Sequence, residues 1–130
     1  MAASTTIDFM FTIDTNVLIY YAAGDADTVE FFRDNQNAVF YLPSIVVAEF
    51  LSYPLMTFGV AERFRDFSRQ TILVNLDYAI AERAAIIRRE TKLPLADAVI
   101  ASSSIITQSS LLTRNIRDFR KVKGLTIVSP

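Results

Sequence analysis

The chain has 130 residues, of which 52% are hydrophobic, and its formal net charge is −1 at pH 7. It contains no Cys and no His, which excludes disulfides, thiolate metal sites, cysteine nucleophiles and the commonest general base of enzymes. Any metal site must therefore use oxygen ligands, and such ligands suit hard cations such as Mg²⁺ or Mn²⁺.

Residues 1–9 are small and polar, and they lack the basic and apolar regions of a signal peptide. We expect a frayed segment there, a single domain over residues 10–130 and a cytoplasmic location. Apolar runs elsewhere are interrupted before they reach the ~20 residues of a membrane span, so no membrane association is expected.

Strands and helices are predicted to alternate along the rest of the chain. A short apolar strand at residues 11–13 precedes a helix at about residues 17–23, and a second helix begins within residues 24–27. Later strands are expected at residues 38–42, 71–74, 111–113 and 125–128, and later helices at residues 44–54, 59–70, 77–90 and from residue 94, with a turn or short helix at residues 115–120. Ser44 and Asp77 are the expected caps of two of these helices, and the second strand is expected to be buried on both faces.

This alternation predicts an α/β domain with a mostly parallel sheet covered by helices on both faces. Ligands of such sheets bind beyond the carboxyl ends of the strands. Asp14 ends the first strand, Glu49 follows the second by a few residues, and Thr113 with Asn115 ends the fourth. We therefore expect these polar residues to meet at one edge of the sheet.

Three acids each stand alone in apolar sequence. The stretches that contain no other charge are residues 10–23 around Asp14, residues 35–61 around Glu49 and residues 93–113 around Asp97. Burying an unpaired carboxylate costs several kcal/mol. One such acid is most simply a helix cap, and Asp14 or Thr15 is well placed to cap the helix that follows. Three such acids with no base nearby in the sequence favour a shared cation.

The charges are unevenly divided along the chain. Residues 1–62 carry eight acids and one base, whereas residues 63–130 carry six acids and twelve bases. A basic half indicates a polyanionic partner, and the Arg residues between Arg63 and Arg89 are candidates for contacts with RNA phosphates. A solvated helix face held by salt bridges is the alternative.

Four segments together resemble PIN-domain nucleases, in particular the VapC-type toxins of toxin–antitoxin pairs. They are residues 13–18 (Ile-Asp-Thr-Asn-Val-Leu), 48–49 (Ala-Glu), 93–101 (Leu-Pro-Leu-Ala-Asp-Ala-Val-Ile-Ala) and 113–119 (Thr-Arg-Asn-Ile-Arg-Asp-Phe). The resemblance extends from about residue 10 to residue 128. It implies a three-layer, PIN-like fold whose five-stranded parallel sheet has its first strand in the centre.

The resemblance also implies an activity. Such proteins bind Mg²⁺ or Mn²⁺ through four acids and cleave single-stranded regions of RNA, and the corresponding acids here are Asp14, Glu49, Asp97 and Asp118. Asn16 and Thr113 would hold these acids or a metal-bound water. From its neighbours alone, Asp118 is a surface turn residue, since Arg117 and Arg120 flank it.

The sequence departs from the family pattern at two places. Ser109-Ser110 stands where such proteins often have Gly, and Tyr53-Pro54 replaces the commoner Tyr-Gly. Neither pair includes a proposed ligand, so the departures concern the substrate and the loops. The alternative to a nuclease is a PIN-like RNA- or protein-binding module without catalysis. A haloacid-dehalogenase phosphatase is disfavoured because Asn16 stands where that chemistry needs a second Asp.

The partners implied by the resemblance are an RNA substrate, an antitoxin and a second copy of the chain in a homodimer. An Arg or Lys of the antitoxin tail would lie near Asp14 and Asp97. The aromatic residues expected to help form an apolar groove for the antitoxin, or else to belong to the core, are Phe31, Phe32, Phe64 and Phe67.

Overall fold

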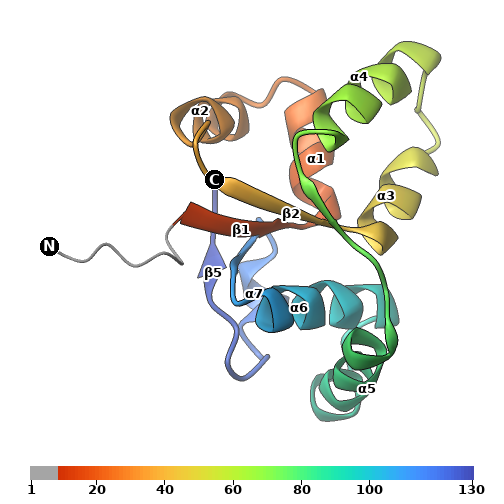
Figure 1. Ribbon diagram of the computed structural model, residues 1–130, viewed down its shortest axis with the longest axis vertical. Helices are drawn as coiled ribbons and strands as arrows, with labels where there is room; N and C mark the ends of the chain where they lie inside the picture. Colours follow the sequence, from red (N-terminus) through yellow and green to blue (C-terminus); the bar gives the residue numbers. More distant parts are fainter. Residues whose placement is uncertain (1–8) are drawn as a thin grey trace, which may run out of the picture.

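The computed structural model describes residues 9–130, which fold around a five-stranded sheet (Figure 1). Its strands are β1 (Met10–Ile13), β2 (Val39–Pro43), β3 (Ile72–Val74), β4 (Ser110–Leu112) and β5 (Ile127–Val128). They lie in the order β3-β2-β1-β4-β5, and each pairing of neighbours is parallel. The expected parallel sheet with the first strand at its centre is confirmed. The expectation of a frayed segment at residues 1–9 lies outside the described residues, apart from Phe9.

Helices cover both faces of the sheet (Figure 1). They are α1 (Thr15–Ala22), α2 (Ala26–Asp34), α3 (Ser44–Leu51), α4 (Phe58–Ser68), α5 (Tyr78–Thr91), α6 (Leu95–Thr107) and the short α7 (Ile116–Phe119). The first four lie on one side of the sheet, whereas α6 packs against β1, β2 and β4 from the other side and α5 packs on α6. This arrangement confirms the three-layer α/β fold. No helix within residues 9–130 has the length and apolar character to cross a membrane.

The register of the central strands brings their carboxyl ends together. Thr12 of β1 lies opposite Tyr41 of β2 and Leu111 of β4. The Asp14 amide extends the ladder by donating to the Leu112 carbonyl at 3.0 Å. Asp14, the start of α3 and the turn after β4 therefore share one edge of the sheet.

The core is built from the central strands and the helices that pack on them. Ile13, Leu42, Ile100 and Leu111 have no exposed surface. Burying a side chain of this kind contributes roughly 1.5–3 kcal/mol relative to leaving it exposed. The apolar strand residues before Asp14 thus fix the end of β1 in the interior of the protein.

β2 is buried only toward its carboxyl end, so the prediction of burial on both faces is wrong for its first residues. Val39 is 37% exposed, whereas Leu42 is fully buried. β3 begins opposite Tyr41, and the start of β2 therefore has no neighbouring strand on that side. β3 is itself an edge strand, and Ile72 and Leu73 are about half exposed.

The helix caps agree with the sequence in one case and differ in another. Asp77 caps α5 as predicted, because its Oδ1 accepts from the Ile80 amide at 2.9 Å. The prediction that Ser44 caps α3 is wrong. Pro43 is the N-cap residue, and the Ser44 hydroxyl instead accepts from the Leu76 amide at 3.2 Å. Ser44 therefore joins the start of α3 to the segment that follows β3.

The end of α6 lacks the glycine that is common at this place in the PIN-domain nucleases that the sequence resembles. Gln108 adopts a left-handed φ of 56°, a conformation that usually favours Gly. Ser109 and Ser110 follow it and are buried. The Ser109 hydroxyl lies 2.6 Å from Thr12 Oγ1, so this serine forms an interior contact below the sheet edge that carries the acids.

Candidate acidic site

Asp14 lies at the end of β1 and is only 4% exposed. Its Oδ1 accepts from the Thr15 amide at 2.8 Å, and its Oδ2 accepts from the Thr113 hydroxyl at 2.7 Å. The capping interpretation is confirmed, because Asp14 is the N-cap residue of α1. The cap also explains why α1 begins at Thr15 rather than near residue 17. Asp14 therefore caps α1 and also lies at the carboxyl edge of the sheet.

Glu49 comes to the same edge on α3, which starts directly after β2. The Thr15 hydroxyl donates to Glu49 Oε1 at 2.6 Å. Thr15 thus links two acids, since its amide donates to Asp14 and its hydroxyl donates to Glu49. From the sequence, Thr15 is expected only as a cap, and its place beside a lone acid is the signal for its second contact.

Asp97 lies in the first turn of α6 and is half-buried. Burial raises the pKa of its carboxyl above the ordinary value, and repulsion from Glu49 and Asp118 raises it further. Among residues 9–130, its side chain accepts no hydrogen bond. Asp97 is therefore held near the other acids by the position of α6 rather than by a donor of its own.

Asp118 lies on α7, beyond the turn that follows β4. Asn115 Nδ2 donates to Asp118 Oδ2 at 3.2 Å, and Lys121 Nζ lies 4.0 Å from Asp118 Oδ1. Its side chain is 47% exposed. The predicted surface position is confirmed, but Asp118 belongs to a short helix rather than a turn, and its charge also acts on Asp97. Asp118 is the only one of the four acids with a cation beside it among the described residues.

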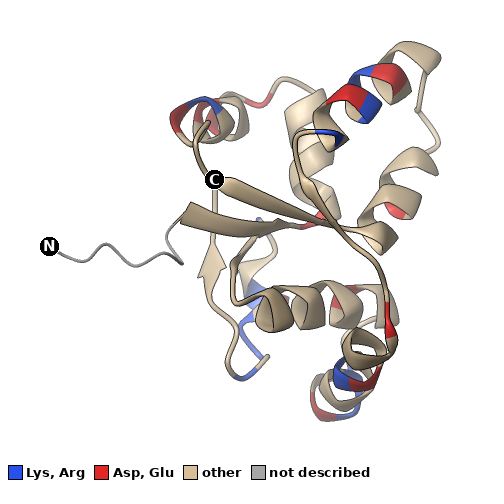
Figure 2. Cartoon of the chain, in the orientation of Figure 1, with Lys and Arg blue, Asp and Glu red and all other residues tan. Residues whose placement is uncertain are grey.

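The electrostatics of the four acids are coupled. Burial raises the pKa of Asp14 to about 6, the Thr113 hydrogen bond opposes this shift, and repulsion from Asp97 and Glu49 adds to it. Within residues 9–130, Asp14, Glu49 and Asp97 have no Lys or Arg within 4.0 Å. Figure 2 shows acidic positions at the end of β1, on α3 and on α6, while basic positions lie on α2, α4 and α5 and from the turn after β4 to the loop before β5. The edge therefore carries negative charge that the described chain leaves uncompensated.

The donor set fits a hard cation that keeps part of its water shell. As the side chains stand, no three acids within residues 9–130 lie close enough to hold one ion together. Mg²⁺ usually binds through one or two carboxylates and retains several waters. Asp14 and a neighbouring acid would supply such carboxylates, and the other acids would add negative charge beside the ion.

The two supporting residues predicted from the sequence have different contacts. Thr113 is fully buried and donates to Asp14. Asn16 makes no hydrogen bond to the four acids; its Oδ1 accepts from the Arg114 backbone amide at 3.5 Å. Asn115 is the residue that holds Asp118. The Thr113-Arg114-Asn115 turn therefore contributes more to the acidic site than Asn16 does.

Replacing Asp97 with Asn is expected to leave the metal-free protein equally stable or to stabilise it by up to about 2 kcal/mol. The change removes repulsion with Glu49 and Asp118, although it also forfeits the ~0.3–1 kcal/mol that an acid contributes near a helix N-terminus. Thermal melts in chelator measure the difference, with the exposed Glu82→Gln as the control. A loss of several degrees in Asp97→Asn alone would identify Asp97 as a structural cap or hydrogen-bonding residue.

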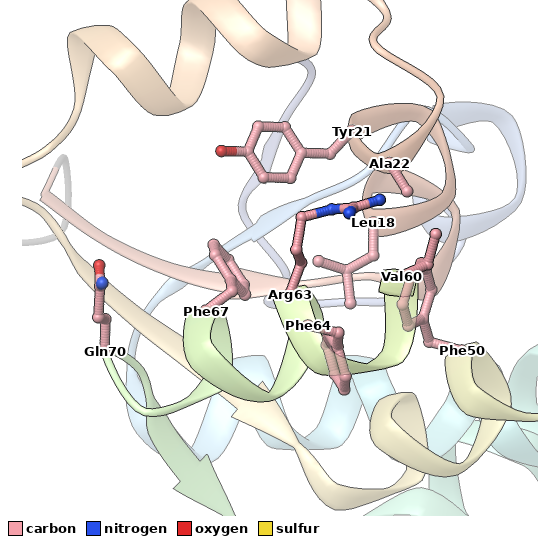
Figure 3. Close-up of a pocket in the computed structure, with 9 residues that line it drawn as sticks. All are labelled: Leu18, Tyr21, Ala22, Phe50, Val60, Arg63, Phe64, Phe67 and Gln70. Atoms are coloured by element: carbon pink, nitrogen blue, oxygen red, sulfur yellow. The ribbon is translucent and has the colours of Figure 1, made fainter. Parts of the chain in front are cut away.

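A pocket of about 430 Å³ lies between α1, α3 and α4 (Figure 3). It is lined by Leu18, Tyr21, Ala22, Phe50, Val60, Arg63, Phe64, Phe67 and Gln70. Figure 3 shows the Arg63 side chain extending from α4 toward Leu18 and Ala22. Leu18 lies one helical turn beyond Asp14, and Phe50 follows Glu49 in α3, so the pocket and the site share two helices.

The predicted aromatic groove is only partly correct. Phe64 and Phe67 line the pocket, although Phe64 is 7% exposed and largely belongs to the core. Phe32 is 8% exposed and lines an adjoining pocket with Phe67. Phe31 lines neither pocket and packs edge-on against Phe11, with ring centroids 5.2 Å apart.

The fold and the site define a class of protein, namely a parallel α/β domain with an acidic site at the carboxyl edge of its sheet. The PIN domain family matches residues 11–125, and the chain belongs to this family. The resemblance inferred from the four sequence segments is thereby confirmed. No curated protein matches the chain at a significant level.

Solved structures of similar fold include several toxin–antitoxin complexes. A chain of VapBC2 from Rickettsia felis, bound to a promoter DNA fragment, has a TM-score of 0.80 and 18% identity, covering 93% of this chain and 98% of that one. A chain of DNA-bound VapBC from Salmonella typhimurium has a TM-score of 0.78 and 21% identity, covering 93% of this chain and 98% of that one. A chain of a toxin–antitoxin complex from Klebsiella pneumoniae has a TM-score of 0.75 and 26% identity, covering 88% of this chain and 94% of that one. The predicted likeness to VapC-type proteins is therefore confirmed at the level of the fold.

Proposed function

We propose that residues 10–130 form a single PIN-like domain that hydrolyses RNA phosphodiester bonds with Mg²⁺ or Mn²⁺. The observation that carries this proposal is the buried, uncompensated carboxylate of Asp14, which repels two neighbouring acids at the sheet edge. Two carboxylates about 4 Å apart repel by roughly 4 kcal/mol at an effective dielectric of 20. A fold that collects such charges without a base is suited to a divalent cation.

The four acids Asp14, Glu49, Asp97 and Asp118 would hold the cation and its waters. A bound divalent ion supplies an activated water and offsets charge on a phosphoryl oxygen. Thr113 and the Thr15 amide fix the plane of the Asp14 carboxylate, because each donates to a different oxygen. The Thr15 hydroxyl orients Glu49, and the side-chain amide of Asn115 orients Asp118. These neutral donors position the carboxylates without neutralising their charge.

The test is incubation of the purified protein with structured RNAs that contain single-stranded loops. Cleavage is expected with Mg²⁺ or Mn²⁺ and is expected to stop in excess EDTA. RNA binding without cleavage at any metal concentration would instead favour the alternative function, a PIN-like binding module without catalysis. Cleavage that persists in EDTA would contradict the metal-dependent mechanism.

We further infer that the protein is the toxin of a toxin–antitoxin pair and acts in the cytoplasm as a homodimer. The similar structures from Rickettsia felis and Salmonella typhimurium are VapBC complexes, which supports a protein partner here. The pocket between α1, α3 and α4 would seat apolar residues of the antitoxin. An Arg or Lys of its tail would then reach Asp14 and Asp97, where it would offset the negative charge in place of the cation.

Co-purification from the native host is expected to recover a small partner that inhibits cleavage. RNA cleavage would be measured before and after the partner is stripped, and activity is expected to rise when it is removed. A chain that purifies alone and is harmless on overexpression, yet cleaves RNA, would contradict the toxin assignment. That result would leave the nuclease assignment intact.

A further inference from the structure

Arg114 lies between two residues that hold acids of the site. Thr113 before it donates to Asp14 at 2.7 Å, and Asn115 after it donates to Asp118 at 3.2 Å. The two are also joined to each other, because the Asn115 amide donates to Thr113 Oγ1 at 2.9 Å. The conformation of this three-residue turn therefore sets the position of two carboxylates at once.

The Arg114 side chain contacts the second half of α1 and the start of α2. Its Nη2 donates to Asp25 Oδ2 in an ion pair and lies 3.2 Å from the Thr28 hydroxyl. Its guanidinium carbon lies 4.3 Å from the centre of the Tyr20 ring, within the range of a cation–π contact. Only 27% of the side chain is exposed. Arg114 therefore anchors the turn to a second part of the fold.

The anchor at Asp25 is itself fixed. Asp25 is the N-cap residue of α2, and its Oδ2 accepts from the Thr28 amide at 3.1 Å and from the Thr28 hydroxyl at 2.8 Å. These donors, with a smaller contribution from Arg114, lower the pKa of Asp25 below its ordinary value. The acid thus remains charged at neutral pH and keeps its attraction for the guanidinium.

We propose that Arg114 is a positioning residue, which holds the turn at residues 113–115 so that Asp14 and Asp118 face the cation. This inference rests on the proposed function. Asp25 and Thr28 engage Nη2 of the guanidinium and Tyr20 contacts its face, so its effect on the site passes through its neighbours Thr113 and Asn115. The planar group makes the ion pair and the ring contact together, which an ammonium group does less well.

The experiment compares Mn²⁺ binding and RNA cleavage by the full chain in five variants, one of which combines Arg114→Gln with Asp25→Asn. Arg114→Gln and Asp25→Asn each break the ion pair, and Asn at residue 25 retains an oxygen for the α2 cap. Arg114→Lys keeps the charge opposite Asp25. The control is Arg117→Gln, which removes an exposed charge two residues from Asn115. Mn²⁺ dissociation constants come from electron paramagnetic resonance, and kcat and KM are measured at saturating Mn²⁺.

Arg114→Gln and Asp25→Asn are each expected to weaken Mn²⁺ binding about tenfold, as substitutions in the outer shell of metal sites commonly do. The double variant is expected to be little worse than either single variant, because both remove the same contact. Arg114→Lys is expected to recover most of the affinity, and Arg117→Gln is expected to match the wild type. Excess Mn²⁺ should restore most of kcat in every variant without a change in KM.

Unchanged Mn²⁺ affinity in both Arg114→Gln and Asp25→Asn, with only a lower Tm, would overturn the positioning role. A rise in KM for RNA with unchanged Mn²⁺ affinity would identify Arg114 as a phosphate contact and would overturn it as well. A wild-type protein that neither binds Mn²⁺ nor cleaves RNA would contradict the proposed function, and this inference with it. The wild-type measurements therefore separate the two failures, and Asp25→Asn provides the test if Arg114→Gln fails to fold.

Discussion

Replacing Asp14 with Asn is expected to slow RNA cleavage by about a thousandfold or more. An anionic ligand that contributes about 4 kcal/mol to the stability of the charged transition state corresponds to that change in rate. Asn is nearly the same size and retains an oxygen that accepts from the Thr15 amide, so the α1 cap is preserved. The lost quantity is the charge, and the measurement is the single-turnover cleavage rate at saturating Mg²⁺ or Mn²⁺.

The matched control for this prediction is Asp66→Asn on α4. Asp66 forms an ion pair with Arg69 at 3.1 Å, and its side chain is 75% exposed. The Asp66→Asn substitution changes the net charge of the protein by the same amount as Asp14→Asn, and no change in cleavage rate is expected. Undiminished cleavage by Asp14→Asn would show that the Asp14 carboxylate is not needed for cleavage. That result would contradict the proposed nuclease mechanism. Equal loss in both variants would attribute the effect to overall charge.

The central strand and the acids could be predicted from the sequence because burial makes isolated charges costly. Asp14 follows an apolar strand directly, and a strand of that composition has no solvated face for a carboxylate. Glu49 and Asp97 stand in equally apolar helices. The alternation of strands and helices then placed all three at one edge of a parallel sheet. Asp118 lacked such a pattern, and only the resemblance to PIN domains identified it.

The contacts that orient these acids could not be predicted, because they join residues far apart in the chain. Ser44 has the composition of a helix cap, yet its hydroxyl accepts from the amide of Leu76. Arg114 appeared as one base among twelve in the second half of the chain, and its partner Asp25 is 89 residues away. Strand register and helix packing decide such pairs, and a single sequence does not contain that information.

The stability of the metal-free protein is expected to fall as the pH rises from about 4 to 7. Burial raises the pKa of Asp14 to about 6, from 3.8 in the unfolded chain. The folded state therefore binds this proton more tightly, and its contribution to stability is complete below about pH 4 and lost as the pH rises through 6. The shift corresponds to roughly 3 kcal/mol of unfolding free energy. Urea denaturation of the wild type and of Asp14→Asn in chelator isolates this contribution, because Asn does not titrate.

A bound divalent cation is expected to offset the destabilisation caused by ionised Asp14 at neutral pH. Binding to the folded state alone stabilises it by about 2.7 kcal/mol at a concentration of one hundred times the dissociation constant, and the ionised Asp14 is the form that binds. Mn²⁺ should therefore raise the stability of the wild type at pH 7, should have little effect near pH 4, and should leave the stability of Asp14→Asn almost unchanged.

The opposite pH dependence would contradict the predicted effect of Asp14. In that case, without metal, the stability of the wild type relative to Asp14→Asn would increase from pH 4 to pH 7. It would mean that the hydrogen bonds from Thr15 and Thr113 outweigh the burial of the charge, and that the edge of the sheet is a structural cap rather than a site prepared for a cation.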